Sequence, residues 1–262
     1  MRTVVVGAGG MLGQDLLRVA PEAVGFTHAQ LDVTDREAVG EAIGPEDLVI
    51  NCAAWTDVDG AEEHEGEALR INRDAARNVA EAAGAVLYVS SDYVFDGAKG
   101  EPYLESDPVN PLSAYGRTKL EGERATAEAN PRHFIVRSSW LFGAGGKNFV
   151  ETMLGLGAEV RVVDDQVGSP TFTGHLADGL ARLARTEDYG LHHMAAAGEC
   201  SWFDFAREIF ARAGSDTRAE PCTTADFPRP APRPAYSVLG SEHGDRLPTW
   251  QEGLDAYLGV RV

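Results

Sequence analysis

Short runs of β-branched and apolar residues alternate with longer alanine-rich stretches through the first half of the chain. The runs lie at residues 3–7, 46–54, 85–91 and 133–140, and the stretches at 11–20, 59–84 and 113–129. Each stretch carries Leu, Ile or Ala at helical spacing and ends near Gly, Pro or Asn. Such alternation predicts a parallel sheet with helices on both faces, a doubly wound, Rossmann-like α/β fold.

The alternation loosens after about residue 145. Helices are still predicted over residues 173–185 and 201–214, and a strand over 190–196, but the proline-rich segment 226–240 indicates irregular chain. We therefore expect a main domain over residues 1–145. Residues 146–262 are expected to form a smaller C-terminal portion whose loops build a binding site, with some elements returning to the main sheet.

Composition excludes several classes of partner. The net charge is −18 and only three of the 23 basic residues are lysines, so the surface repels nucleic acid and anionic membranes. A solubilising acidic surface is one explanation, and we favour adaptation to high internal salt, a halophilic protein. No secretory signal and no apolar run of about 18 residues is found, which predicts a cytoplasmic protein without a membrane span.

No metal site is predicted. Cys52, Cys200 and Cys222 are scattered and lack the spacing of zinc ligands or of a disulfide framework. The acidic run at residues 59–67 is best explained as a solvated helix face.

A glycine-rich turn follows the first predicted strand. Gly7, Gly10 and Gly13 recur at three-residue spacing, which lets main-chain N–H groups approach a pyrophosphate at a helix N-terminus. We therefore interpret residues 1–145 as a dinucleotide-binding domain. The cofactor-binding positions expected in this turn are Gly7, Gly10, Met11, Leu12 and Gly13.

The acidic residue that would bind the ribose of NAD is missing from the end of the second strand, which offers Thr27 and His28. Asp32 and its neighbour Val33 lie further on, where we expect Asp32 to meet the adenine. Because no carboxylate excludes a 2′-phosphate, the predicted cofactor is NADPH or NADH.

Tyr115 and Lys119 lie four residues apart on a predicted helix and therefore share one face. An ammonium group near a phenol favours the phenolate, which suits a proton donor. Such a pair also occurs by chance on helix surfaces, but Ser91 and Asp92 follow a predicted strand at the edge where ligands bind. A serine there can orient a carbonyl oxygen toward the tyrosine.

Several motifs in order carry a resemblance to a known family. They are "GAGGMLGQDL", "INCAAWTDVDGAE", "VSSDYVFDG", "NPLSAYGRTKLEGE", "VRSSWLFG", "VVDDQVGSPT" and "RPAYSVL". The chain resembles the extended short-chain dehydrogenases/reductases and, among them, the dTDP-4-dehydrorhamnose reductase family. That resemblance implies reduction of the C4 keto group of a nucleotide-linked 4-keto-6-deoxysugar, with dTDP-4-dehydro-L-rhamnose becoming dTDP-L-rhamnose.

The resemblance also implies residue roles. Tyr115 would protonate the C4 oxygen, while Lys119 would bind the nicotinamide ribose and lower the tyrosine pKa. Ser91, the third catalytic residue, keeps the hydroxyl usual in the family. Ala53, Ala54 and Thr56 would lie along the cofactor. The residues implied at the substrate are Thr56, Val58, Ser91, Asp92, Trp140, Asn148, Phe149 and Arg233.

Arg229 and Arg233 of the proline-rich segment are the candidates to hold a diphosphate through bidentate hydrogen bonds. A homodimer is left open. Two alternatives are a related nucleotide-sugar reductase or epimerase and a non-catalytic dinucleotide-binding regulatory subunit. The complete set Ser91, Tyr115 and Lys119 favours catalysis.

Overall fold

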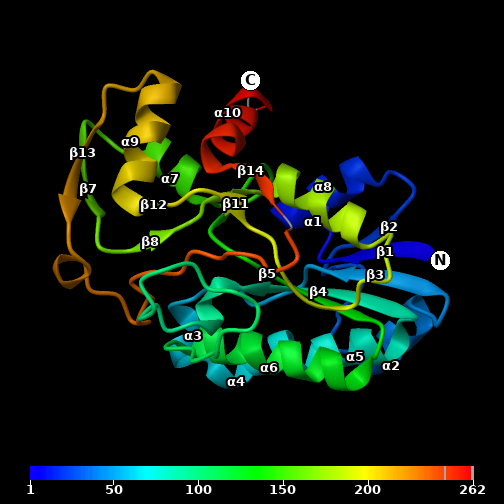
Figure 1. Cartoon of the computed structure of the whole chain (residues 1–262). Coiled ribbons are helices and arrows are strands. Elements are labelled where there is room, and N and C mark those ends of the chain that lie inside the picture. The colour runs from blue at the N-terminus through cyan, green and yellow to red at the C-terminus, as the bar shows by residue number, and fades with distance from the viewer. Residues whose placement is uncertain (245, 261–262) are drawn as a thin grey trace.

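The computed structural model describes residues 1–244 and 246–260 (Figure 1). Its strands are β1 (Arg2–Val6), β2 (Val24–Phe26), β3 (Asp47–Asn51), β4 (Ala85–Ser91), β5 (His133–Ser138), β6 (Leu141–Phe142), β7 (Glu159–Val163), β8 (Val167–Gly168), β9 (Thr171–Phe172), β10 (Gly190–His193), β11 (Ala196–Ala197), β12 (Cys200–Ser201), β13 (Arg218–Cys222) and β14 (Leu247–Thr249). Its helices are α1 (Met11–Val19), α2 (Arg36–Ala42), α3 (Gly60–Glu63), α4 (Glu65–Leu69), the π-helical η1 (Arg70–Asp74), α5 (Ala75–Ala82), the 3-10 helix η2 (Asp92–Val94), α6 (Ala114–Ala129), α7 (Phe149–Leu154), α8 (Thr173–Leu183), α9 (Trp202–Ala213), the 3-10 helix η3 (Thr224–Asp226) and α10 (Trp250–Val260).

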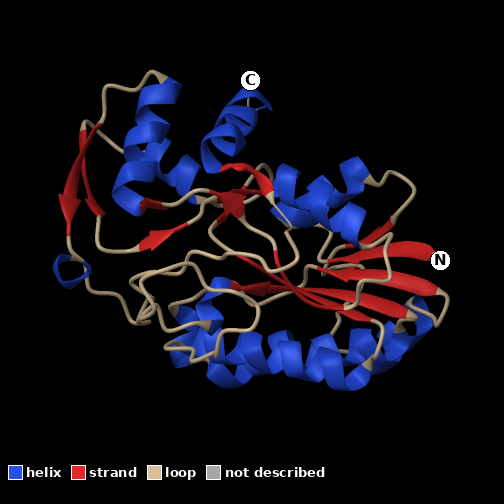
Figure 2. Ribbon diagram, viewed as in Figure 1, coloured by secondary structure: helices blue, strands red, loops and turns tan. Residues whose placement is uncertain are grey.

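Six parallel strands form the central sheet in the order β10-β5-β4-β3-β1-β2. Helices cover both of its faces (Figure 2), so the predicted doubly wound, Rossmann-like fold is confirmed. The chain leaves β1 for β2 on one side and then returns to β3 on the other. In such sheets the ligand crevice lies at the carboxyl ends of the strands where the order reverses, here β1 and β3.

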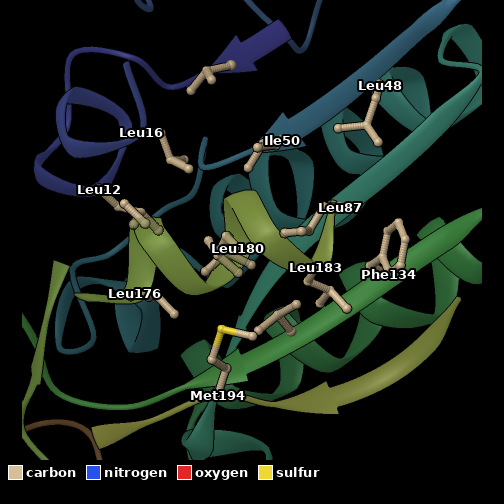
Figure 3. Close-up of a cluster of buried hydrophobic side chains, with 14 of the residues drawn as sticks. Leu12, Leu16, Leu48, Ile50, Leu87, Phe134, Leu176, Leu180, Leu183 and Met194 are labelled. Atoms are coloured by element: carbon tan, nitrogen blue, oxygen red, sulfur yellow. The ribbon is translucent and has the colours of Figure 1, made fainter. Parts of the chain in front are cut away.

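Helices α1 and α8 cover one face of the sheet, and α2, α5 and α6 cover the other (Figure 1). Leu12 and Leu16 of α1 lie one turn apart and pack with Leu176 and Leu180 of α8 against Ile50 of β3 (Figure 3). This apolar contact fixes the start of α1, and with it the glycine turn, against the end of β1.

The helix predicted over residues 59–84 is wrong as a single element. His64, with φ −126° and ψ 39°, ends α3 and precedes α4, and η1 then forms a π-helical turn. Inside that turn the buried Asn72 accepts a hydrogen bond from the Trp55 N–H at 2.9 Å and donates one to Thr118 Oγ1 at 2.9 Å. These tertiary bonds fix the distorted turn, because they link it to the β3 loop and to α6.

A second apolar core lies between α7, α9 and α10 and contains Phe142, Phe205 and Trp250. Two C-terminal elements lie elsewhere: β10 pairs with β5 in the main sheet, and α8 packs on α1. The division at residue 145 remains a prediction. None of the described helices combines the length and the apolar character that a membrane span requires.

Candidate active site

Two glycines of the turn after β1, Gly7 and Gly13, have no room for side chains. Gly7 has φ +75°, and a Cβ atom there would lie 2.7 Å from the main-chain N of Ala53. A Cβ atom on Gly13 would lie 2.4 Å from the Gly7 oxygen. Glycine at these positions therefore lets β1, the β3 loop and α1 meet closely, which leaves the start of α1 open toward the crevice.

A cavity of about 560 Å³ lies over this turn. Of the predicted cofactor residues, Gly7, Gly10, Asp32, Val33, Ala53, Ala54 and Thr56 line it. Met11, Leu12 and Gly13 are not in its lining, because Leu12 points into the core and Gly13 serves helix packing. Residues of the lining that the sequence analysis did not assign to the cofactor include His28, Cys52, Arg70 and Ile71.

Arg70 is the main addition to this cavity. It is the first residue of the π-helical turn, which follows the break at His64 and the short helix α4, and no local sequence signal marks it. Asp32 accepts hydrogen bonds from the N–H and the hydroxyl of Thr34 at 2.9 and 2.8 Å, and these bonds lower the pKa of its carboxyl group. The carboxyl group of Asp32 is thus ionised, and hydrogen bonds within its own turn fix its position.

Tyr115 lies in the first turn of α6. Ser113 caps this helix by accepting a hydrogen bond from the Gly116 N–H at 3.1 Å. A Cβ atom on Gly116 would lie 2.1 Å from the Tyr93 oxygen, so glycine lets α6 approach η2 closely. This approach brings Tyr115 beside Ser91 and places its ring edge-on to Tyr93, with centroids 5.7 Å apart.

Burial raises the pKa of Tyr115 to about 12, while a hydrogen-bond interaction with Ser91 acts in the opposite direction and the charge of Asp92 adds to the rise. The phenol is therefore protonated at neutral pH. Burial also raises the pKa of Asp92, to about 7, against the hydrogen bonds from Ser237 and Ser91.

The side chain of Lys119 contacts β4 and is buried. Its Nζ atom donates a hydrogen bond to the Val89 oxygen at 2.7 Å and lies 4.3 Å from the centroid of the Tyr88 ring. Burial lowers the pKa of Lys119 to about 7. Ser91 opposes the rise of the Tyr115 pKa, and the effect of Lys119 on that pKa remains a prediction.

A second cavity of about 580 Å³ lies between the main sheet and the C-terminal elements. Its apolar lining comes mainly from α7, β7 and α9, and it includes Tyr93 beside Tyr115. Of the predicted substrate residues, Phe149 and Arg233 line it, and Thr56 lines the first cavity. The others line neither cavity: Val58, Ser91, Asp92, Trp140 and Asn148. Met153, Trp202 and Phe227 are lining residues that the sequence analysis missed.

Trp140 and Asn148 have other partners. Trp140 has φ +47° and stacks on Trp202 with ring centroids 3.5 Å apart. Asn148 caps α7 by accepting a hydrogen bond from the Glu151 N–H at 3.0 Å, and its amide donates to the Gly143 oxygen at 2.8 Å. The structure gives Asn148 a capping role, and its substrate contact remains a prediction.

Arg229 and Arg233 converge on one carboxylate. Arg229 Nε donates to Asp59 Oδ2 at 2.8 Å, and Arg233 NH1 donates to Asp59 Oδ1 at 2.9 Å. The Ala231 N–H adds a third contact to Asp59, at 3.1 Å. Sequence analysis missed this acidic partner, which lies about 170 residues away in the chain.

One side-chain group among the described residues has the composition of a cation site. Asp188, His192 and His243 each offer a ligand atom within 4.8 Å of the others. A ring nitrogen of His192 lies at hydrogen-bonding distance, 2.8 Å, from the Asp188 main-chain oxygen. His192 and His243 line neither of the two cavities, and neither does Asp188.

Comparison with known proteins identifies the family. A family model described as the RmlD substrate binding domain matches residues 1–261. The chain belongs to this family. It is 44% identical over 260 residues to a dTDP-4-dehydrorhamnose reductase of Streptomyces griseus, a match covering 91% of this chain and 85% of that protein. The predicted resemblance to the dTDP-4-dehydrorhamnose reductase family is confirmed.

Two further similar proteins have names that state a sugar substrate or a bound cofactor. A probable dTDP-4,6-dihydroxy-2-methyloxan-3-one 4-ketoreductase of Streptomyces antibioticus is 42% identical over 258 residues, 92% of this chain and 88% of that protein. The dTDP-4-dehydrorhamnose reductase of Bacillus anthracis, solved in complex with NADP, superposes with a TM-score of 0.95. It is 36% identical, and the match covers 100% of this chain and 99% of that one.

Proposed function

We propose that this chain is an NAD(P)H-dependent oxidoreductase that reduces the C4 keto group of a nucleotide-linked 4-keto-6-deoxysugar, converting dTDP-4-dehydro-L-rhamnose to dTDP-L-rhamnose. The observation that carries the proposal is the position of Tyr115. Its ring contacts Tyr93, which lines the second cavity, while Lys119 from the same helix interacts with Cys52 of the first. Tyr115 and Lys119 line neither cavity themselves, but each interacts with a residue of a different ligand-sized cavity.

The first cavity fits a dinucleotide, because Gly7, Gly9 and Gly10 line it and carry no side chains that would occupy the space. Gly7 and Gly10 would hold the pyrophosphate at the start of α1, and Ala53, Ala54 and Thr56 would lie along the rest of the cofactor. When bound, the reduced nicotinamide supplies the hydride that the reduction requires.

Tyr115 would supply the proton. Its raised pKa keeps the phenol protonated, so the proton is available for the C4 oxygen. Ser91 lies beside the phenol and would hydrogen-bond the same oxygen, which orients the carbonyl group. Lys119, fixed by the Val89 oxygen, would present its other N–H groups to the nicotinamide ribose.

The second cavity would hold the nucleotide part of the substrate. Phe149, Trp202 and Phe227 offer apolar and aromatic surface for a base. Arg229 and Arg233 lie at the same cavity and would bind the diphosphate. Their positive charges would offset locally the repulsion between an anionic ligand and a chain of net charge −18. Asp59 fixes both guanidinium groups before the substrate arrives.

Turnover of a defined substrate tests the proposal. Purified protein is supplied with dTDP-4-dehydro-L-rhamnose and with NADH or NADPH, in low and high salt, and both the loss of reduced nicotinamide and the sugar product are measured. We expect stoichiometric formation of dTDP-L-rhamnose. Absence of turnover in every condition, from protein that still binds the cofactor, would contradict catalysis and favour a regulatory subunit.

A related ketoreductase is the second candidate function. It is favoured by the 42% identity to the Streptomyces antibioticus protein, whose name describes 4-ketoreduction of a different dTDP-linked sugar. Parallel assays with dTDP-4-keto sugars that differ in deoxygenation and stereochemistry separate the two by kcat/KM. The high-salt arm tests the halophilic prediction, while the cytoplasmic location and a homodimer stay predictions.

A further inference from the structure

Ser237 lies in the C-terminal segment but donates a hydrogen bond to Asp92, the neighbour of the predicted catalytic residue Ser91. Its hydroxyl is 2.6 Å from Asp92 Oδ2, and both side chains are almost completely buried. Ser91 donates to the other oxygen, Asp92 Oδ1, at 3.0 Å. The carboxyl group of Asp92 is thus held between two hydroxyl groups, one from each part of the chain.

The main chain fixes the position of Ser237. Its N–H donates to the Val167 oxygen at 2.8 Å, and the Val167 N–H donates to the Ala235 oxygen at 2.9 Å. Val167 belongs to β8, which pairs with β12 at the start of α9. Because α9 contributes Trp202 to the second cavity, Ser237 is connected to the elements that would hold the nucleotide.

The bond from Ser237 affects how Ser91 uses its hydroxyl. Ser91 accepts a hydrogen bond from the Tyr93 N–H at 3.2 Å and gives its own hydrogen to Asp92. A bound carbonyl oxygen would compete with Asp92 Oδ1 for that hydrogen, and Ser91 would change acceptor by rotating its O–H bond while its oxygen atom stays in place. By occupying Oδ2, Ser237 holds the Asp92 carboxyl group, and with it the Ser91 side chain, in the position from which the hydroxyl reaches the carbonyl oxygen.

We propose that Ser237 is a positioning residue for the reduction, which acts through Asp92 to fix the hydroxyl of Ser91 beside Tyr115. The proposal deepens the proposed function and, for its kinetic test, rests on it. Ser237 itself lines neither of the two cavities.

The charges around Asp92 set the expected pH dependence. Tyr93 of the same turn and Tyr115 of α6 are the titratable side chains that interact with Asp92, and Arg233 and Asp59 act on Tyr93 in turn. The hydrogen bonds from Ser237 and Ser91 lower the pKa of Asp92 against the larger effect of burial. Removing the Ser237 hydroxyl should therefore raise this pKa further.

Three variants of Ser237 test the role. Ser237→Ala removes the donor, Ser237→Cys keeps the size with a weaker donor, and Ser237→Thr keeps the hydroxyl. We expect the first two to lower kcat by roughly tenfold or more without changing the dissociation constant of the cofactor, and Ser237→Thr to restore most of the rate. The ionisation expected near pH 7 in the kcat profile should move to higher pH in Ser237→Ala.

Ser241→Ala is the matched control. Ser241 lies in the same segment and donates to a carboxylate of the main domain, Glu105 Oε1, at 3.0 Å, away from the catalytic group. This variant should keep the wild-type kcat and pH profile. Equal losses in Ser237→Ala and Ser241→Ala, or a wild-type rate and profile in Ser237→Ala and Ser237→Cys, would overturn the proposal.

A measurement without substrate separates this inference from the proposed function. Isotope-edited infrared spectroscopy follows the aspartic acid carbonyl band with pH, and Asp92→Asn assigns the band. We expect a titration near pH 7 in the wild type and at higher pH in Ser237→Ala. An unchanged titration overturns the Ser237 inference even if the enzyme is active, whereas an inactive wild type with the expected shift contradicts only the proposed reaction.

Discussion

The ammonium group of Lys119 donates a hydrogen bond to the main-chain oxygen of Val89 at 2.7 Å, from a side chain that is 2% exposed. This bond links α6 to β4 at Val89, the residue directly before the pair Ser90 and Ser91. Burial lowers the pKa of the lysine, which makes the charged form costly in the folded state.

Lys119 should therefore make stability depend on pH. Between about pH 7 and the ordinary lysine pKa of 10.5, Lys119 binds a proton in the unfolded chain but not in the folded chain. The free energy of unfolding therefore increases as the pH rises through this range. Lys119→Met lacks this contribution. Denaturant unfolding at several pH values measures the free energy of unfolding. Across that range this free energy should increase more in the wild type than in Lys119→Met, whereas it should change in the exposed variant Lys147→Met as it does in the wild type. A constant difference for Lys119→Met would argue against a lowered pKa.

Tyr115→Phe removes the proposed proton donor but keeps the ring against Tyr93. We expect kcat to fall by about 10²- to 10⁴-fold, the range for loss of a general acid. Cofactor binding, followed by fluorescence titration, should be unchanged. An unaffected kcat would assign the proton to another group.

Asp59→Asn removes the charge that organises Arg229 and Arg233. Burial opposes ionisation of Asp59, but hydrogen bonds from the two arginines and from the Ala231 N–H hold its pKa far below the ordinary value. The substitution should lower the free energy of unfolding by about 1–3 kcal/mol. Exposed Glu63→Gln should stay within about 0.5 kcal/mol of the wild type. In a double-mutant cycle with Arg233→Gln the two losses should not add; strict additivity would show that the pair is not coupled.

Trp202→Ala removes the ring that lines the second cavity and stacks on Trp140. We expect KM for the nucleotide sugar to rise by a few-fold to about tenfold, because an aromatic face and the support of Trp140 are both lost. Trp202→Phe keeps an aromatic face and should lie between the wild type and Trp202→Ala. Equal KM values in all three proteins would place the nucleotide elsewhere.

Arg70→Ala tests the choice of cofactor. Arg70 and His28 line the first cavity, and the end of β2 carries no carboxylate to repel a 2′-phosphate. Loss of this guanidinium should weaken NADPH binding by about tenfold and leave NADH binding nearly unchanged. Arg73→Ala, whose side chain pairs with Asp74 at 2.7 Å, is the control. Equal weakening of both cofactors would show that Arg70 does not recognise the phosphate.

The local parts of the site could be predicted from the sequence because their geometry depends on neighbours in the chain. The strand, glycine turn and helix at residues 2–19 form one continuous unit, and the conformational freedom of glycine makes that turn recognisable. The shared helix face of Tyr115 and Lys119 follows from helical periodicity alone. The alternation of strands and helices likewise predicted the doubly wound sheet.

The partners of these residues were decided by the tertiary structure. Asp59 meets Arg229 across 170 residues, and Ser237 meets Asp92 across 145, because the C-terminal segment returns to the carboxyl edge of the sheet. Arg70 reaches the first cavity only through the break at His64, and Lys119 turns to Val89 only because α6 packs on β4. Thus the sequence by itself determined the sheet and the glycine turn, and it predicted Ser91, Tyr115 and Lys119 as the reacting groups. Only the fold decided which charges and hydrogen bonds surround them, because burial and contacts between distant segments leave no periodic signal in the chain.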